Sequence, residues 1–145
     1  NLDTTINGDD IPHIRIHNTL SNYEANGVLS YHYVASNGYG ICCALFIAQN
    51  GTMVEAEASE HKLMPCLALA LGGGSGTRPI IYSGLVRNDN WTFTPGKYVY
   101  VSPLVFGGLT QTKPTAPGNI VQVVGIPVEP NILRFDPSLV TVEIS

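Results

Sequence analysis

The sequence predicts an all-β protein, an antiparallel β-barrel or sandwich of about eight to ten short strands. Three observations lead to this fold class. The 145 residues include 15 Gly and 10 Pro, which interrupt the chain too often for long helices. Apolar stretches recur about every 8–12 residues, with turn residues between them. Hydrophobic residues make up 44% of the chain, enough apolar surface to offset the entropy cost of ordering it.

Two regions differ in composition. Residues 1–22 are polar and contain one short alternating piece, 14–17, after an Ile-Pro break. This region has too little apolar content for a core of its own, so we expect an extended N-terminal arm that lies on a neighbouring molecule. Residues 23–145 form the predicted β-barrel or sandwich domain.

The first predicted strand of the domain covers residues 28–34 and ends at the turn residues 36–38. Residues 39–49 follow as a nearly unbroken apolar run, which predicts a strand that needs cover on both faces. Asn50-Gly51 then lies between two apolar runs, which predicts a hairpin with a type I′ turn.

The return strand of that hairpin is predicted over residues 52–59, where small apolar residues alternate with Glu and Ser. The Ala and Glu content of the same segment, continued to Met64, leaves a short helix open as an alternative. The remaining strands are predicted at 66–71, 79–86, 91–93, 97–102, 120–126, 132–135 and 139–144, separated by Gly-rich and Pro-rich loops.

The composition argues against nucleic-acid and membrane partners and gives the cysteines a structural role. Charged residues make up only 12%, the net charge is −4 and the seven basic residues are scattered, so nucleic-acid binding is not expected. No apolar stretch reaches the roughly 18 residues of a membrane span, so no membrane partner is expected. Cys42, Cys43 and Cys66 are odd in number, and the first two would point to opposite faces of one strand, so we interpret all three as small buried side chains.

Catalysis has little support in the sequence, and we expect no enzyme, metal or cofactor. Glu55 and Glu57 would share a strand face about 7 Å apart, a spacing compatible with paired-carboxylate hydrolysis but also with an ordinary solvated face. No Gly-x-Ser-x-Gly motif occurs. The Gly-rich loop 72–76 is not followed by the Lys-Ser/Thr of a phosphate-binding loop.

One cluster has the composition of a sugar-binding surface. Asn88, Asp89, Asn90 and Trp91, followed by Thr92, place an aromatic ring beside amide and hydroxyl groups. Aromatic rings stack on the apolar faces of sugars while the polar groups bond to sugar hydroxyls. We therefore predict a glycan-binding site here, with the alternative that Trp91 fills the end of a barrel.

Residues 64–145 resemble a small β-rich module of bacteriophage virion surface proteins, of the capsid decoration, head fibre and tail fibre type. The resemblance rests on these segments: Met64-Pro65, Gly84-Leu85-Val86-Arg87-Asn88, Trp91, Pro95-Gly96-Lys97-Tyr98-Val99-Tyr100-Val101-Ser102, Gly107-Gly108-Leu109-Thr110-Gln111-Thr112, Gln122-Val123-Val124-Gly125-Ile126, Phe135-Asp136-Pro137-Ser138 and Val142-Glu143-Ile144. The motifs are structural rather than catalytic. The resemblance implies a homotrimer located on the virion, with capsid or fibre subunits as partners.

The low charge also favours assembly, because surplus apolar surface can be buried between subunits. We predict an oligomer interface at Ile41, Cys43, Leu45 and Ile47. The expected function is a non-enzymatic virion structural protein that stabilises or presents the particle surface. The alternative is a receptor-binding tip that recognises a host surface glycan, and glycan hydrolysis through Glu55 and Glu57 is a third, testable hypothesis.

Overall fold

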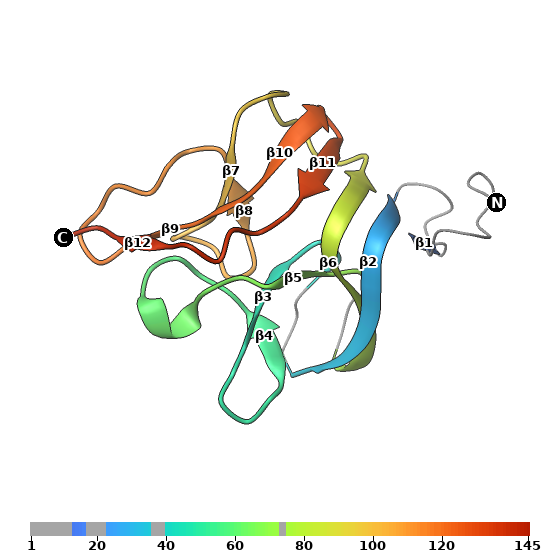
Figure 1. Cartoon of the computed structure of the whole chain (residues 1–145), viewed down its shortest axis with the longest axis horizontal. Coiled ribbons are helices and arrows are strands. Elements are labelled where there is room, and N and C mark those ends of the chain that lie inside the picture. The colour runs from blue at the N-terminus through green and yellow to red at the C-terminus, as the bar shows by residue number, and fades with distance from the viewer. Residues whose placement is uncertain (1–12, 17–22, 36–39, 73–74) are drawn as a thin grey trace.

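The computed structural model describes the backbone of residues 13–16 and all atoms of residues 23–35, 40–72 and 75–145. Within these residues the regular structure is almost entirely β, which confirms the predicted all-β class (Figure 1). The strands are β1 (His13–Ile16), β2 (Tyr23–Val34), β3 (Ala44–Ile47), β4 (Met53–Glu55), β5 (Ala68–Ala70), β6 (Gly76–Asn88), β7 (Val99–Val101), β8 (Leu109–Thr110), β9 (Ile120–Val121), β10 (Val123–Glu129), β11 (Ile132–Phe135) and β12 (Val142–Glu143). A short 3-10 helix, η2 (His61–Leu63), follows β4.

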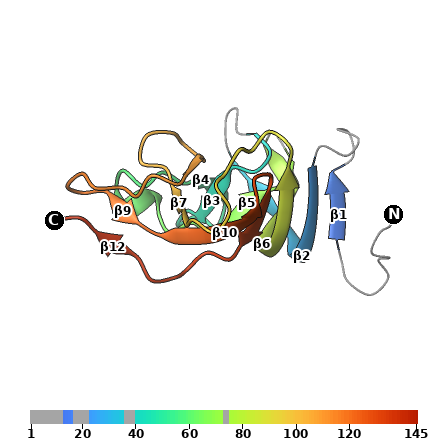
Figure 2. The same ribbon diagram turned by 90° about the horizontal axis from the view of Figure 1, so that it is seen from above.

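Ten strands form one sheet in the order β1-β2-β4-β3-β5-β6-β11-β10-β7-β8, and β12 pairs with β9 separately. β2 and β6 also pair with each other along their whole length, so β2, β6, β5, β3 and β4 close into a ring. The ring closes through the pair Val34 and Met53, the only parallel pairing among the described strands. From above, β1 lies beside β2 at one end of the molecule, and β12 with the C-terminus lies at the other (Figure 2).

Within the ring, β3 and β5 are buried on both faces, whereas β2 and β6 keep exposed side chains such as Tyr31 and Leu85. Inside the ring pack Val34, Leu45, Met53, Ala68, Ala70 and Ile80. Their strand neighbours, such as Phe46, Leu69 and Ile81, belong to a second and larger cluster with the side chains of β7, β10 and β11. This alternation follows from the period of two along a strand. The apolar run at 39–49 therefore finds much of its two-sided cover within its own chain.

The strand predicted over 39–49 is shorter than expected. Ile41 and Cys42 form a turn, and only residues 44–47 are extended as β3. Cys42 has a φ of 69°, in the left-handed region, so Cys42 and Cys43 do not lie on opposite faces of a strand as predicted. The turn is held because the Cys42 N–H donates to the Ala70 carbonyl at 2.7 Å.

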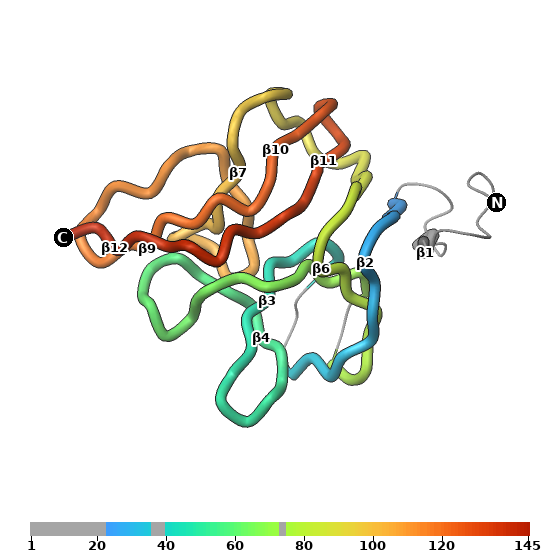
Figure 3. The backbone as a smooth tube through the Cα atoms, viewed as in Figure 1, coloured from blue at the N-terminus to red at the C-terminus, as the bar shows by residue number. Residues whose placement is uncertain are grey.

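The predicted hairpin at Asn50-Gly51 is confirmed, since β3 and β4 pair on either side of it (Figure 3). Its turn is not type I′, because Gly51 has a φ of 88° while Asn50 does not take a positive φ. The Asn50 side chain instead accepts hydrogen bonds from the Thr52 N–H at 3.1 Å and the Thr52 hydroxyl at 2.8 Å. Asn50 therefore stabilises the turn through its side chain, and only the glycine supplies the left-handed backbone.

Other predicted boundaries change in detail. The strand predicted at 52–59 ends at Glu55, and the helical alternative survives only as η2. Residues 91–93 are not a strand, and the strand predicted at 139–144 is reduced to β12. Of the predicted arm, residues 13–16 form the edge strand β1 on β2, while residues 1–12 and 17–22 lie outside the described residues.

Candidate functional site

The four residues predicted to bind glycan lie where β6 ends. Asn88 is the last residue of β6 and is 7% exposed, whereas Asp89 and Asn90 are exposed and Trp91 is half-buried. The Asn88 carbonyl accepts a hydrogen bond from the Trp91 N–H at 2.9 Å, and its side-chain oxygen accepts one from the Asn90 N–H at 2.9 Å. Asn88 thus fixes the turn that presents Asn90 and Trp91.

A cleft of about 360 Å³ lies beside this turn. Its walls come from three segments that are distant in sequence: residues 41–43, residues 88 and 90–93, and residues 107–109. Trp91 and Phe93 contribute two aromatic rings whose centroids are 5.2 Å apart and whose planes are inclined at 41°. The structure therefore brings Asn88, Asn90 and Trp91 to one concave surface.

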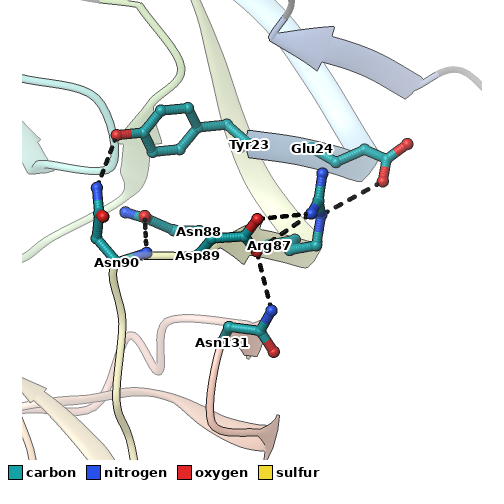
Figure 4. Close-up of polar contacts among 7 residues, drawn as sticks. All are labelled: Tyr23, Glu24, Arg87, Asn88, Asp89, Asn90 and Asn131. Atoms are coloured by element: carbon teal, nitrogen blue, oxygen red, sulfur yellow. Dashed lines mark hydrogen bonds and ion pairs between the residues drawn. The ribbon is translucent and has the colours of Figure 1, made fainter. Parts of the chain in front are cut away.

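Asp89 does not line this cleft. Its carboxylate accepts hydrogen bonds from Arg87 at 3.0 and 3.1 Å and from the Asn131 side chain at 3.0 Å, away from Asn90 (Figure 4). The Asn90 amide donates instead to the Tyr23 hydroxyl at 3.1 Å. The structure therefore does not bring Asp89 into the cleft with its three neighbours, because Arg87 and Asn131 hold its side chain elsewhere.

Two cysteines, Cys42 and Cys43, are among the residues that line the cleft. Burial raises the pKa of Cys42 to about 12, although a hydrogen bond with the Asn88 side chain acts in the opposite direction. Burial also raises the pKa of Cys43, whose sulfur accepts a hydrogen bond from the Gly40 N–H at 3.2 Å. Both thiols are therefore neutral near pH 7 and are poor nucleophiles.

Gly107 allows two walls of the cleft, residues 107–109 and residues 41–43, to lie close together. It has a φ of 73°, and a Cβ at this position would lie 2.9 Å from the Cβ of Cys43. Its carbonyl accepts a hydrogen bond from the Ala44 N–H at 2.9 Å. The loop can reach β3 only because residue 107 has no side chain.

The four residues predicted as an oligomer interface do not share a surface. Ile41 and Cys43 are half-buried and line the cleft. Leu45 is fully buried inside the ring, so it cannot meet a second subunit, and only Ile47 is well exposed, at 41%. The prediction for Leu45 is wrong because β3 is covered on both faces by its own chain.

An exposed apolar loop, Leu104-Val105-Phe106, was not singled out from the sequence. These side chains are 86%, 59% and 59% exposed, although the Ser102 hydroxyl accepts hydrogen bonds from the backbone N–H of Leu104 at 3.0 Å and of Val105 at 3.1 Å. The loop is thus anchored while its side chains face outward. The sequence signal that could have indicated this exposed loop is a run of three large apolar residues between Pro103 and Gly107-Gly108.

The described residues offer no metal site and no membrane-spanning helix. No group of three or more His, Cys, Asp or Glu side chains within them is placed to hold a metal ion, and no helix among them is long and apolar enough to cross a bilayer. Glu55 lies in β4, whereas Glu57 lies beyond the end of that strand and accepts a hydrogen bond from the Ser59 hydroxyl at 2.6 Å. Glu55 and Glu57 therefore do not lie side by side along one strand face.

Comparison with family models, curated proteins and solved structures finds no match to this chain.

Proposed function

We propose that the chain is a non-enzymatic structural protein of a phage virion, a capsid decoration or fibre protein that assembles as a homotrimer and stabilises or presents the particle surface. The observation that carries this proposal is the exposed apolar loop Leu104-Val105-Phe106 on a chain with only 12% charged residues. Exposed apolar clusters on a folded protein are typical of sites that contact another molecule.

The surroundings of the loop also favour assembly. It connects β7 to β8, and β8 is the last strand of the ten-stranded sheet. An unpaired sheet edge beside exposed apolar side chains offers both backbone hydrogen bonds and apolar area to a neighbouring subunit. The segment that resembles virion modules, residues 64–145, contains this loop.

The mass in solution tests the assembly. Light scattering after size exclusion is expected to give three times the chain mass of 15.5 kDa. The double substitution Leu104→Asp with Phe106→Asp is expected to yield monomers, because each carboxylate would have to be buried without a partner. Val128→Asp is the matched control, since Val128 is also half-exposed but lies on β10, and it should leave the mass unchanged.

A folded monomer at micromolar concentration would contradict the assembly. The virion role is tested separately, by antibody labelling of particles of the phage that encodes the chain. The particles are expected to be labelled, and deletion of the gene is expected to lower their heat tolerance. Unlabelled particles would reject the role.

A further inference from the structure

We propose that the cleft beside Trp91 binds one ring of an uncharged sugar, a neutral hexopyranose or N-acetylhexosamine residue, through stacking on the aromatic rings and hydrogen bonds to Asn90 and Thr92. This inference goes beyond the structural role proposed above and does not depend on it.

The walls of the cleft select for a neutral ligand. Among the described residues, no Asp, Glu, Lys, Arg or His lines it, and the one carboxylate close behind its wall, Glu55, acts on Cys43 and would repel an anion. The two cysteines in the wall are protonated near pH 7, because burial raises their pKa. A carboxylate or sulfate in this cleft would lose water without gaining a counter-charge, which is costly. Acidic sugars are therefore disfavoured.

The aromatic rings are held in place before any ligand arrives. The backbone that carries the rings is fixed, because the backbone N–H of Trp91 donates to the Asn88 carbonyl and that of Phe93 to the Pro130 carbonyl, each at 2.9 Å. Both rings are half-buried and pack partly against the larger core cluster. Ordering them costs little when a ligand binds, so the apolar face of a sugar ring can stack on a rigid surface.

Polar groups border these rings. The Asn90 amide donates to Tyr23, which orients the side chain, and among the described residues its oxygen accepts no hydrogen bond. The Thr92 side chain is exposed at the same wall. Such a pairing of apolar rings with a few fixed polar groups is typical of small-molecule sites.

The size of the cleft limits how much of a glycan it can hold. Its volume of about 360 Å³ is near the lower end of the roughly 300–1,000 Å³ found for ligand sites. We therefore infer that a single sugar ring occupies it and that the rest of a glycan chain lies outside.

Tryptophan fluorescence tests the proposal directly, because Trp91 is the only tryptophan of the chain. The intact protein is titrated with methyl galactoside, methyl glucoside and methyl N-acetylglucosaminide, and with methyl glucuronide as an acidic ring of similar size. A saturable change in emission is expected with at least one neutral glycoside. The glucuronide is expected to bind at least about tenfold more weakly, a difference of 1.4 kcal/mol.

Matched variants connect the signal to the cleft. Asn90→Ala is expected to weaken binding about tenfold or more, whereas Asp89→Asn, one residue away but outside the cleft, should bind like the original protein. Trp91→Ala is followed by ligand-observed NMR and should lose binding. If that variant does not fold by circular dichroism, the comparison of Asn90→Ala with Asp89→Asn decides.

The proposal is overturned if no neutral glycoside changes the emission at millimolar concentrations, if the glucuronide binds equally well, or if Asp89→Asn weakens binding as much as Asn90→Ala. These outcomes are separate from the test of assembly. The loop substitutions are expected to change the mass of the protein in solution. The cleft substitutions are expected to change only the binding of the glycoside.

Discussion

The side-chain amide of Gln122 and the backbone of Cys66 form a closed pair of hydrogen bonds in the protein interior. The Gln122 oxygen accepts from the Cys66 N–H at 2.9 Å, and the Gln122 nitrogen donates to the Cys66 carbonyl at 2.9 Å. The same nitrogen also donates to the Ser138 carbonyl at 2.7 Å. Gln122 separates β9 from β10, so its side chain joins three parts of the chain where the strand is interrupted.

Gln122→Ala is expected to lower the free energy of unfolding by about 3 kcal/mol, because each buried polar group left without a partner costs about 1–3 kcal/mol. Three backbone groups lose their partner in this variant. Urea denaturation of the original protein and the variant measures the difference.

Gln111 provides a control with the same pattern of bonds. Its side chain donates to the carbonyls of Thr94 and Lys97 and accepts from the Thr94 N–H, each at 2.9 Å, but these bonds are exposed. Gln111→Ala is expected to cost about 1 kcal/mol or less, because water replaces the lost bonds. Equal losses of unfolding free energy in the two variants would show that burial does not determine how much these three hydrogen bonds stabilise the protein.

Gly27 and Gly84 lie directly opposite each other in the antiparallel pair of β2 and β6. A Cβ on Gly84 would lie 2.2 Å from the Asn26 carbonyl oxygen, and one on Gly27 would lie 2.1 Å from that of Ser83. Either Gly→Ala substitution must push the two strands apart, so we expect a loss of about 4 kcal/mol or more, at the upper end for single substitutions. Thermal unfolding measures it.

Gly40→Ala is the control for this pair, because a Cβ at Gly40 would meet no atom within 4 Å. Its effect is expected to stay within about 0.5 kcal/mol. A small loss at Gly84 would mean that β2 and β6 can separate at this point without breaking the ring.

Local patterns predicted more of the fold than of the site. The pair Asn50-Gly51 predicted the hairpin correctly, because a glycine can adopt the left-handed backbone conformation of the turn without help from distant parts of the chain. The run at 39–49 predicted cover on two faces, but not that the chain itself supplies much of it. That cover comes from the other strands of the ring on one face and from β7, β10 and β11 on the other, which a local pattern does not identify.

The candidate site depends on contacts between distant segments, and this limits what the sequence can show. Asn88, Asn90 and Trp91 were recognisable from their side-chain chemistry, and the structure brings them to one cleft. Asp89 looked equivalent in sequence, but Asn131, 42 residues away, takes part in holding it elsewhere. Gly107 closes the cleft through its lack of a side chain, a role that no spacing rule indicates.

Cys66 is expected to make stability depend on pH in the alkaline range. It is fully buried, and burial raises its pKa from 9.0 to about 12 in the folded protein. Above pH 9 the unfolded chain therefore releases a proton from Cys66 that the folded chain keeps, so the contribution of Cys66 is complete below pH 9 and falls as the pH rises towards 12. This contribution declines by about 1.4 kcal/mol per pH unit. Cys42, whose pKa burial also raises to about 12, adds a decline that the original protein and a Cys66 variant share.

Unfolding of the original protein and of Cys66→Ala is compared between pH 7 and pH 11. The two curves should run parallel up to pH 8.5, and the variant should then decline less steeply, since it lacks this proton. Curves that remain parallel up to pH 11 would contradict a buried thiol at this position.

Leu45 and Ile47 lie on the same strand, and their substitution separates folding from assembly. Leu45 fills the inside of the ring, so Leu45→Ala is expected to cost about 2–5 kcal/mol. Ile47 is 41% exposed and belonged to the interface predicted from the sequence. Ile47→Ser is expected to leave the stability of the isolated chain within about 0.5 kcal/mol. Any effect on assembly would appear as a change in how the melting temperature depends on protein concentration.

Calorimetry over a hundredfold range of concentration distinguishes the two effects. The loss for Leu45→Ala should be the same at every concentration, because the cavity it creates lies within one subunit. If the loss instead shrinks on dilution, Leu45 contributes to a contact between subunits, and the ring would have to open on assembly.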